Sequence, residues 1–191
     1  LAVLRPYEVY RALVRAMAAR LRAAQGAQVQ GPDYLASAER LAAPMGARLL
    51  ITCGLSGSGK STLAAALVQQ GAVRLRSDVE RKRLYGLAPL QDSAALGLDI
   101  YTTEASRRTF ACLADQARAL LQAGYPVIVD AAFLRQRERD DFRALARALG
   151  LPFSILHCHA AGHSLRERVQ ERQAAGTDPS EADLAVLARQ Q

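Results

Sequence analysis

The pattern of hydrophobic and polar residues changes character once along the chain. In the first part, apolar residues such as Val9, Leu13 and Met17 recur every four positions, which predicts an amphipathic helix over 7–24. A polar stretch with a Gly-Pro pair follows, and a second helix is expected at 34–42. The chain is therefore expected to begin with a helical segment.

After this segment, short apolar runs alternate with helical patterns. The first run, Leu49-Leu50-Ile51-Thr52-Cys53, leads through glycines into a helical pattern, and the same order then repeats. The expected strands are 49–53, 72–75, 126–129 and 153–158, and the expected helices between and after them are 61–70, 78–85, 102–123 and 135–149. Strands that alternate with helices predict an α/β fold, a doubly wound parallel sheet covered on both faces.

The composition agrees with a soluble globular protein. Hydrophobic residues make up 50% and charged residues 23% of the 191 positions, which excludes disordered and collagen-like classes. No apolar run reaches eighteen residues and the Arg-rich start lacks the core of a secretory signal, so no membrane contact and a cytoplasmic location are expected.

The basic residues carry two further hints. The net charge is +7, but acidic residues are interleaved with the arginines, so a nucleic-acid partner is possible without being favoured over phosphate-rich small ligands. Of the 25 basic residues only Lys60 and Lys82 are lysines. Where arginine serves every general purpose, a lysine indicates a specific task.

The segment from Gly54 to Ser61 reads GLSGSGKS and matches the phosphate-binding pattern GxxxxGK[ST] between a strand and a helix. Glycines let backbone amides surround phosphate oxygens, the lysine reaches the β and γ phosphates, and the serine hydroxyl ligates Mg²⁺. The residues expected to bind a nucleoside triphosphate are Gly54, Leu55, Ser56, Gly57, Ser58, Gly59, Lys60, Ser61 and Thr62. The competing interpretation is a flexible glycine-serine turn.

The second expected strand ends in front of Asp78, with Arg81 three residues later on the same helix face. A carboxylate at that position can accept a proton from an attacking hydroxyl, and Arg81 can hold a polar or anionic part of an acceptor. The alternative is that Asp78 only caps a helix.

The third expected strand also ends in a carboxylate. Asp130 follows the apolar run Val127-Ile128-Val129, which is typical of an acidic residue that organises a metal ion or its water in phosphate-loop proteins. A purely structural aspartate is the alternative.

Two arginines form the last candidate pair. Arg168 and Arg172 lie four residues apart, before the turn at 176–180. They can neutralise charge on a transferred phosphoryl group if their helix folds over the site. The alternative is a solvated helix face with weak ion pairs.

With these motifs, the stretch from Leu49 to Gln191 resembles the P-loop kinases related to polynucleotide 5′-kinases, zeta toxins and gluconate and adenylate kinases. It is most similar to ATP-binding kinases fused behind an aminoglycoside-phosphotransferase-like domain. The resemblance rests on the loop 54–61, Asp78 with Arg81, VIVD ending at Asp130, and the Arg168–Arg172 pair.

The resemblance implies a nucleoside-monophosphate-kinase-like fold, ATP with Mg²⁺ as donor, Asp78 as general base and Arg172 as lid arginine. Residues 1–45 are then expected to be the end of an upstream domain plus linker, and residues 46–191 a P-loop kinase domain truncated at its C-terminus. The expected activity is phosphoryl transfer from Mg-ATP to a hydroxyl of a small molecule, with Asp78, Arg81 and Asp130 near that substrate and Ser61 and Asp130 at the metal. A regulatory ATP-binding module and a polynucleotide 5′-hydroxyl kinase are the alternatives.

Overall fold

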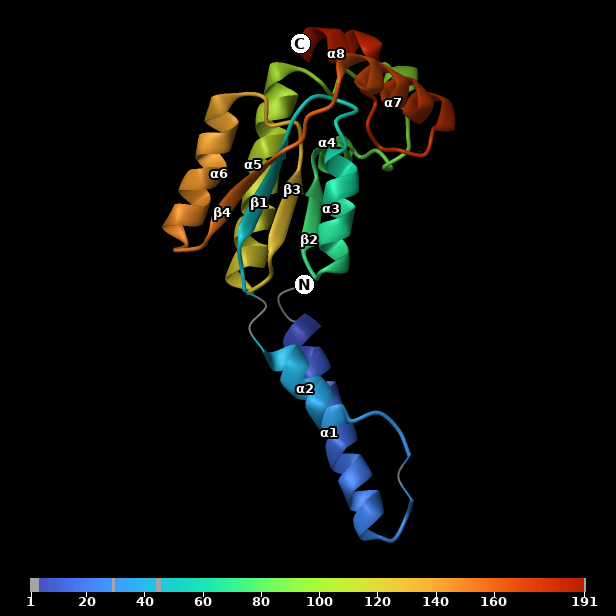
Figure 1. The fold of residues 1–191 in the computed structure, drawn as a ribbon, viewed down its shortest axis with the longest axis vertical. Helices are drawn as coiled ribbons and strands as arrows, with labels where there is room; N and C mark the ends of the chain where they lie inside the picture. Colours follow the sequence, from blue (N-terminus) through green and yellow to red (C-terminus); the bar gives the residue numbers. More distant parts are fainter. Residues whose placement is uncertain (1–3, 29, 44–45, 191) are drawn as a thin grey trace. The chain divides into compact units, whose positions relative to one another are not determined.

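A computed structural model describes residues 4–28, 30–43 and 46–190. The chain divides into two compact units, one with the first two helices and one that starts at Gly46 (Figure 1). None of the helices in the described part of the chain combines the length and hydrophobicity needed to cross a membrane.

The first unit is a pair of helices, α1 (Leu4–Ala24) and α2 (Tyr34–Ala42). Asp33 caps α2 by accepting hydrogen bonds from two backbone amides of its first turn, each 3.0 Å long. The guanidinium of Arg5 in α1 donates to the carbonyl of Leu41 in α2, at 2.6 Å. No residue of α1 is buried, and Tyr10 and Met17 are 63% and 61% exposed, so this helix keeps much of its apolar face in solvent.

The second unit is built on a parallel sheet of four strands in the order β2-β3-β1-β4. The strands are β1 (Leu49–Cys53), β2 (Val73–Arg76), β3 (Val127–Asp130) and β4 (Phe153–His157). In the sheet Leu49 pairs with Val127 on one side and with Phe153 on the other, while Arg76 is aligned with Asp130. The carboxyl ends of all strands therefore meet at one edge, where ligands bind in open parallel sheets.

Helices cover both faces of the sheet. Figure 1 shows α5 and α6 on one face and α3 on the other, with α7 and α8 beyond the carboxyl ends of the strands. The helices are α3 (Lys60–Gln69), α4 (Ser77–Leu84), α5 (Thr103–Gln122), α6 (Gln136–Ala148), α7 (Gly162–Ala175) and α8 (Leu184–Gln190), with a short 3-10 turn at Ala94–Leu96. The predicted α/β fold is confirmed. The strands and helices predicted with bounds lie within two residues of the observed ones, except that α1 begins three residues earlier, at Leu4. Helix α8 was not predicted.

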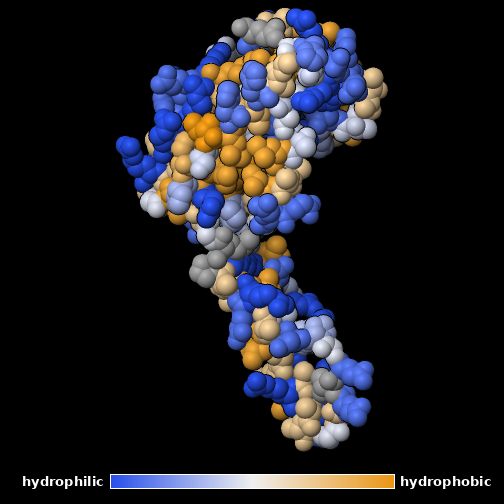
Figure 2. Space-filling view, in the orientation of Figure 1, coloured by the Kyte–Doolittle hydropathy of each residue, from blue (hydrophilic) through white to orange (hydrophobic). Residues whose placement is uncertain are grey.

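The main core lies between the sheet and the face that carries α5 and α6. Phe133 and Phe142 are 0% and 1% exposed, and their rings meet edge to face with centroids 5.1 Å apart, with Phe110 against both. Edge-to-face contact adds to the energy gained by burying each ring. In Figure 2, apolar residues also show at the centre of the visible face of this unit, surrounded by hydrophilic ones.

We expect Phe142→Ala to lower the free energy of unfolding by about 3–5 kcal/mol, because the truncation leaves a cavity between two other rings. Urea denaturation followed by circular dichroism measures this change. The control is Leu90→Ala in an exposed loop, where the side chain is 59% exposed, and its effect should stay within about 0.5 kcal/mol. Equal effects of the two substitutions would contradict the assigned core.

Candidate functional site

The loop between β1 and α3 curves tightly, and at two of its glycines a residue with a side chain would collide with neighbouring backbone. At Gly54 (φ +145°) a Cβ atom would lie 2.2 Å from the carbonyl oxygen of Cys158. At Gly57 (φ +80°) it would lie 2.7 Å from the carbonyl oxygen of Leu165. Side chains at either position would force the loop away from β4 or α7, so the expected phosphate-binding curve depends on glycine here.

Positive charge collects inside this loop. Gly59 precedes α3 in a left-handed conformation and no side chain caps the helix, so the first amides of α3 face the loop as donors for an anion. The Lys60 ammonium donates to the Leu55 carbonyl at 2.6 Å. Burial lowers the pKa of Lys60, and the carboxylates of Asp130 and Asp78 partly offset that effect.

One loop amide already has a partner from the far end of the chain. The backbone N–H of Ser56 donates to Oε1 of Gln190, the last residue of α8, at 2.9 Å. A side-chain carbonyl thus sits where a phosphate oxygen would be expected to accept.

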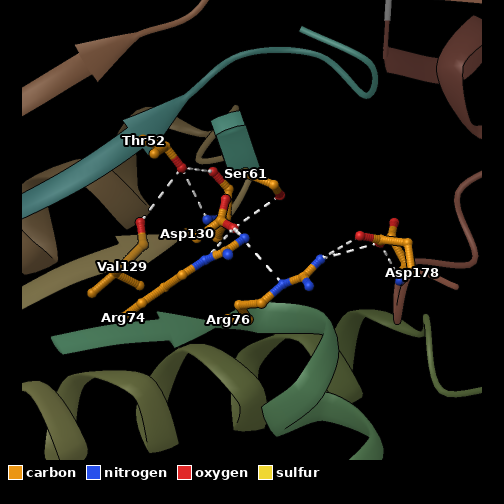
Figure 3. Close-up of polar contacts among 9 residues, drawn as sticks. Thr52, Ser61, Arg74, Arg76, Val129, Asp130 and Asp178 are labelled. Carbon is orange, nitrogen blue, oxygen red and sulfur yellow. Dashed lines mark hydrogen bonds and ion pairs between the residues drawn. The ribbon is translucent and has the colours of Figure 1, made fainter. Parts of the chain in front are cut away.

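Asp130 lies at the centre of a polar cluster at the end of β3 (Figure 3). Its Oδ2 accepts from the Ser61 hydroxyl at 3.0 Å and from the Nε and a terminal nitrogen of Arg74, the Nε at 3.0 Å. The Nε of Arg76 lies 3.8 Å from the same oxygen. Asp130 is 5% exposed, and a buried carboxylate needs such partners. The two residues predicted to hold a metal ion, Ser61 and Asp130, are therefore neighbours.

Asp78 lies in the first turn of α4, beyond the carboxyl end of β2. The N-cap of α4 is Arg76, so the capping alternative for Asp78 is wrong. Burial raises the pKa of the Asp78 carboxyl, while Arg81, Arg76 and a hydrogen bond from the Ser180 hydroxyl act in the opposite direction. A carboxylate with a raised pKa is a stronger proton acceptor once ionised.

Arg81 is more deeply placed than the sequence alone indicated. It is 7% exposed, and its guanidinium donates to the Ile100 carbonyl at 2.9 Å and to the Ser106 hydroxyl at 3.3 Å. The same group stacks over the Tyr101 ring, 5.0 Å from its centroid. Its Nε is buried without a partner. Arg81 thus holds the loop before α5 in place as well as lining the site.

The two arginines of α7 reach the site from the other side. Arg168, which is exposed, donates to the Gly57 carbonyl at 3.2 Å. Arg172 donates to the Ala182 carbonyl at 2.5 Å, and its Nε is buried without a partner. Both side chains border the same cleft. Because only Arg168 is exposed, the alternative of a solvated helix face fits Arg168 better than Arg172.

Most of the predicted residues border one cleft of about 1330 Å³ at the carboxyl ends of the strands. The exceptions are Gly54, Leu55 and Ser58, which do not line it. The loop contributes its amides and Lys60, α4 contributes Asp78 and Arg81, and β3 ends at Asp130. The cleft wall continues through Phe133, which has a left-handed φ of +47°. That conformation is uncommon for a bulky residue and tends to occur near functional sites.

Four interactions at the cleft were not predicted. Arg74 pairs with Asp130, Gln190 binds the loop, and ion pairs join Asp178 to Arg76 and Glu181 to Lys82. Of these, only the pair of Glu181 with Lys82 could have been suspected from the sequence, because lysine is rare in this chain. Within the described residues, no group of three or more His, Cys, Asp or Glu side chains is arranged to hold a metal ion.

Comparisons with known proteins agree with this architecture. Residues 49–191 match the model of the family described as AAA domain. No curated protein matches the chain.

Solved structures with the same fold include several kinases. A chain of the Pnkp1/Rnl/Hen1 RNA repair complex is 21% identical, with a TM-score of 0.59, over 75% of this chain and 42% of that one. A gluconokinase from Sinorhizobium meliloti 1021 is 18% identical, with a TM-score of 0.53, over 78% of this chain and 74% of its own. The APS kinase CysC of Mycobacterium tuberculosis is 22% identical, with a TM-score of 0.53, over 68% of this chain and 72% of its own. This chain thus spans less than half the length of the first.

We expect Asp130→Asn to lower the free energy of unfolding by about 3–5 kcal/mol, because it leaves the Arg74 guanidinium without its carboxylate in a largely buried place. The side chains of this pair are only 4% and 18% exposed. The matched control is Asp140→Asn, whose pair with Arg143 lies on the surface and should contribute about 0–1 kcal/mol. Urea titrations of both variants measure the contrast, and similar losses would contradict a structural role for Asp130.

The ion pair of Asp178 should make stability depend on pH. Burial would raise the pKa of Asp178, but bonds from the Ser180 amide and the Arg76 guanidinium outweigh it and lower that pKa below 3.8. The stabilisation is therefore complete above the ordinary pKa and is lost as the pH falls through the lowered value.

We accordingly expect the difference in unfolding free energy between the native protein and Asp178→Asn to stay constant above about pH 5 and to shrink below about pH 4. Denaturation at a series of pH values measures it. Asp141→Asn, at an exposed position, serves as control. A difference that grows on acidification would refute the assignment.

Proposed function

Since the chain belongs to the AAA domain family and has a P-loop kinase fold, we propose that it is an ATP-dependent phosphotransferase that moves the γ-phosphoryl group of Mg-ATP to a hydroxyl of a small molecule. The observation that carries the proposal is the shared cleft, in which the phosphate-binding loop, the Asp78 carboxylate and Arg172 border one space. That combination supplies what phosphoryl transfer needs: a phosphate cradle, a proton acceptor and a cation for developing charge.

Each group has a separate part in the proposed reaction. The amides of the loop and Lys60 bind the phosphates, and Arg172, with Arg168 at the rim, neutralises charge on the transferred group. Asp78 accepts the proton of the acceptor hydroxyl, and its raised pKa suits that task. Arg81 fixes the loop around Ile100 and Tyr101, which borders the acceptor side.

A magnesium ion fits the oxygen atoms at Ser61 and Asp130. Mg²⁺ prefers oxygen ligands and keeps several waters, so a site with few protein ligands suits it. The Ser61 hydroxyl and the Asp130 carboxylate lie 3.0 Å apart beside the loop. The ion would supply charge neutralisation at the phosphates.

The small-molecule acceptor is supported by the neighbouring structures named gluconokinase and APS kinase. A polynucleotide 5′-hydroxyl acceptor is the second candidate, favoured by the likeness to a chain of an RNA repair complex. A third, a regulatory ATP-binding module, gains support from the exposed apolar side chains of α1, which suit the proposal that residues 1–45 belong with an upstream domain.

The test is transfer of labelled γ-phosphate from Mg-ATP into a metabolite extract and, separately, into a 5′-hydroxyl oligonucleotide. Lys60→Ala should abolish transfer by removing the phosphate-binding cation. Asp78→Asn should lower the rate by about 10²–10⁴-fold with ATP binding retained, while Asp140→Asn, on the solvent side of α6, should behave as native.

Label in a small molecule supports the proposal, and label in the oligonucleotide favours the second candidate instead. ATP binding without transfer to any acceptor would favour the regulatory module. Full transfer by Asp78→Asn would refute its role as the proton acceptor.

A further inference from the structure

One of the two lysines of the chain lies in the interior beside the cleft. Lys82 is in the last turn of α4 and is 2% exposed, although a lysine is almost never fully buried without a partner. Its ammonium lies 2.9 Å from Oε1 of Glu181 and donates to the Pro89 carbonyl at 3.1 Å. The proposed reaction gives this buried cation no part, so its place in the structure needs another explanation.

The partner of this lysine also holds a second segment of the chain. Oε1 of Glu181 accepts from the backbone N–H of Ser93 at 2.9 Å, and Oε2 accepts from the Ser93 hydroxyl at 2.6 Å. Ser93 is 3% exposed, and its own carbonyl accepts from the Leu98 amide at 3.0 Å. Both oxygens of the carboxylate are thus engaged, and Glu181 fixes the segment 86–98 through its backbone as well as through a side chain.

The ion pair connects this segment to the helix that carries the proposed base. Lys82 comes from α4, whereas Glu181 follows α7 and binds the segment 86–98. Asp78 lies four residues before Lys82 in α4, which places the two on one face of the helix. Glu181 and several residues of the segment 86–98 line the cleft together with Asp78. The pair therefore fixes where this wall of the cleft lies relative to the base.

The chemistry of the pair suits a fixed connection. An ammonium is a compact charge with three donors on a flexible stem, whereas a guanidinium is wide and planar. Burial would raise the pKa of Glu181, but the bonds from Ser93 and Lys82 outweigh it and lower that pKa, so the carboxylate is ionised at neutral pH. Separating the two residues would leave the buried Lys82 charge unpaired, and the pair therefore resists opening.

We propose that Lys82 and Glu181 are positioning residues for the phosphoryl acceptor, and that their ion pair holds the segment 86–98 where an acceptor hydroxyl can reach Asp78. The inference rests on the proposed function, because it assumes an acceptor at that base. Within the described residues, the hydrogen bonds and ion pairs of the two side chains do not involve the loop 54–61. A displaced wall should therefore weaken use of the acceptor, by up to about 10²-fold for a shift of about 1 Å, and leave nucleotide binding unchanged.

The experiment uses the full chain, labelled Mg-ATP and a dilution series of a metabolite extract. Glu181→Gln keeps one oxygen as an acceptor for Ser93 and loses the charge that pairs with Lys82. We expect it to lower the labelling rate at limiting extract by about 10–100-fold. The Mg-ATP concentration for half-maximal rate should stay within about twofold of the native value. The matched control is Glu171→Gln, at an exposed position of α7, which should behave as native.

A second variant separates positioning from stability. Lys82→Met leaves Glu181 without its cation and should destabilise the fold, whereas Lys82→Met combined with Glu181→Gln has no unpaired charge and should unfold at a urea concentration closer to the native one. This double variant should still label the extract slowly. Its amides in the segment 86–98 should exchange hydrogen faster than in the native protein, while those of the loop 54–61 exchange at the native rate.

The outcomes distinguish this inference from the proposed function. Native labelling rates in Glu181→Gln and in the double variant would overturn the positioning role. Equal losses in the response to extract and to Mg-ATP would also overturn it, because a defect of the whole fold affects both. Either result leaves the proposed function intact, whereas absence of transfer from the native protein to any acceptor would overturn both.

Discussion

The buried carboxylate of Asp130 is the interaction on which the rest of the site depends. It ends a strand whose four residues are all buried, and it accepts hydrogen bonds from β2 through Arg74 and from the start of α3 through Ser61. An anion in that place must be paired, so strand order, loop position and helix start are fixed together. The cleft opens where these three elements meet.

The side of the cleft proposed to take the acceptor is held together by a different kind of interaction. There the chain has little regular structure, and ion pairs rather than hydrogen bonds between strands hold distant segments together. Arg76 and Lys82 come from β2 and α4, while their partners Asp178 and Glu181 lie about a hundred residues later. The pairs join the beginning and the end of this unit across the cleft, so residues distant in sequence share one wall.

The sequence was sufficient for the features that repeat or follow a known pattern. Alternating strands and helices, the glycine loop and the strand-end carboxylates follow from periodicity and residue type, and the fold they predicted is confirmed. The pairing of Arg74 with Asp130 could not be read in this way, because it depends on two strands becoming neighbours in the sheet.

Other misses have related physical causes. The seven-residue helix α8 is too short for its periodicity to be recognised, and its role at the loop depends on tertiary packing of Leu187 against Leu165 and Val169. The burial of Arg81 depends on a loop whose sequence has no regular pattern. Lys82 did stand out, as one of two lysines, but nothing in the sequence named Glu181 as its partner.

The contact between Gln190 and the Ser56 amide has a consequence for nucleotide binding. A ligand that takes this amide must first release the glutamine, so its observed affinity is the intrinsic affinity reduced by the free energy of that contact. Because Gln190 ends α8, occupancy of the loop and attachment of α8 are thermodynamically linked. Stronger docking of this last turn would weaken nucleotide binding by the same factor by which the nucleotide loosens the turn.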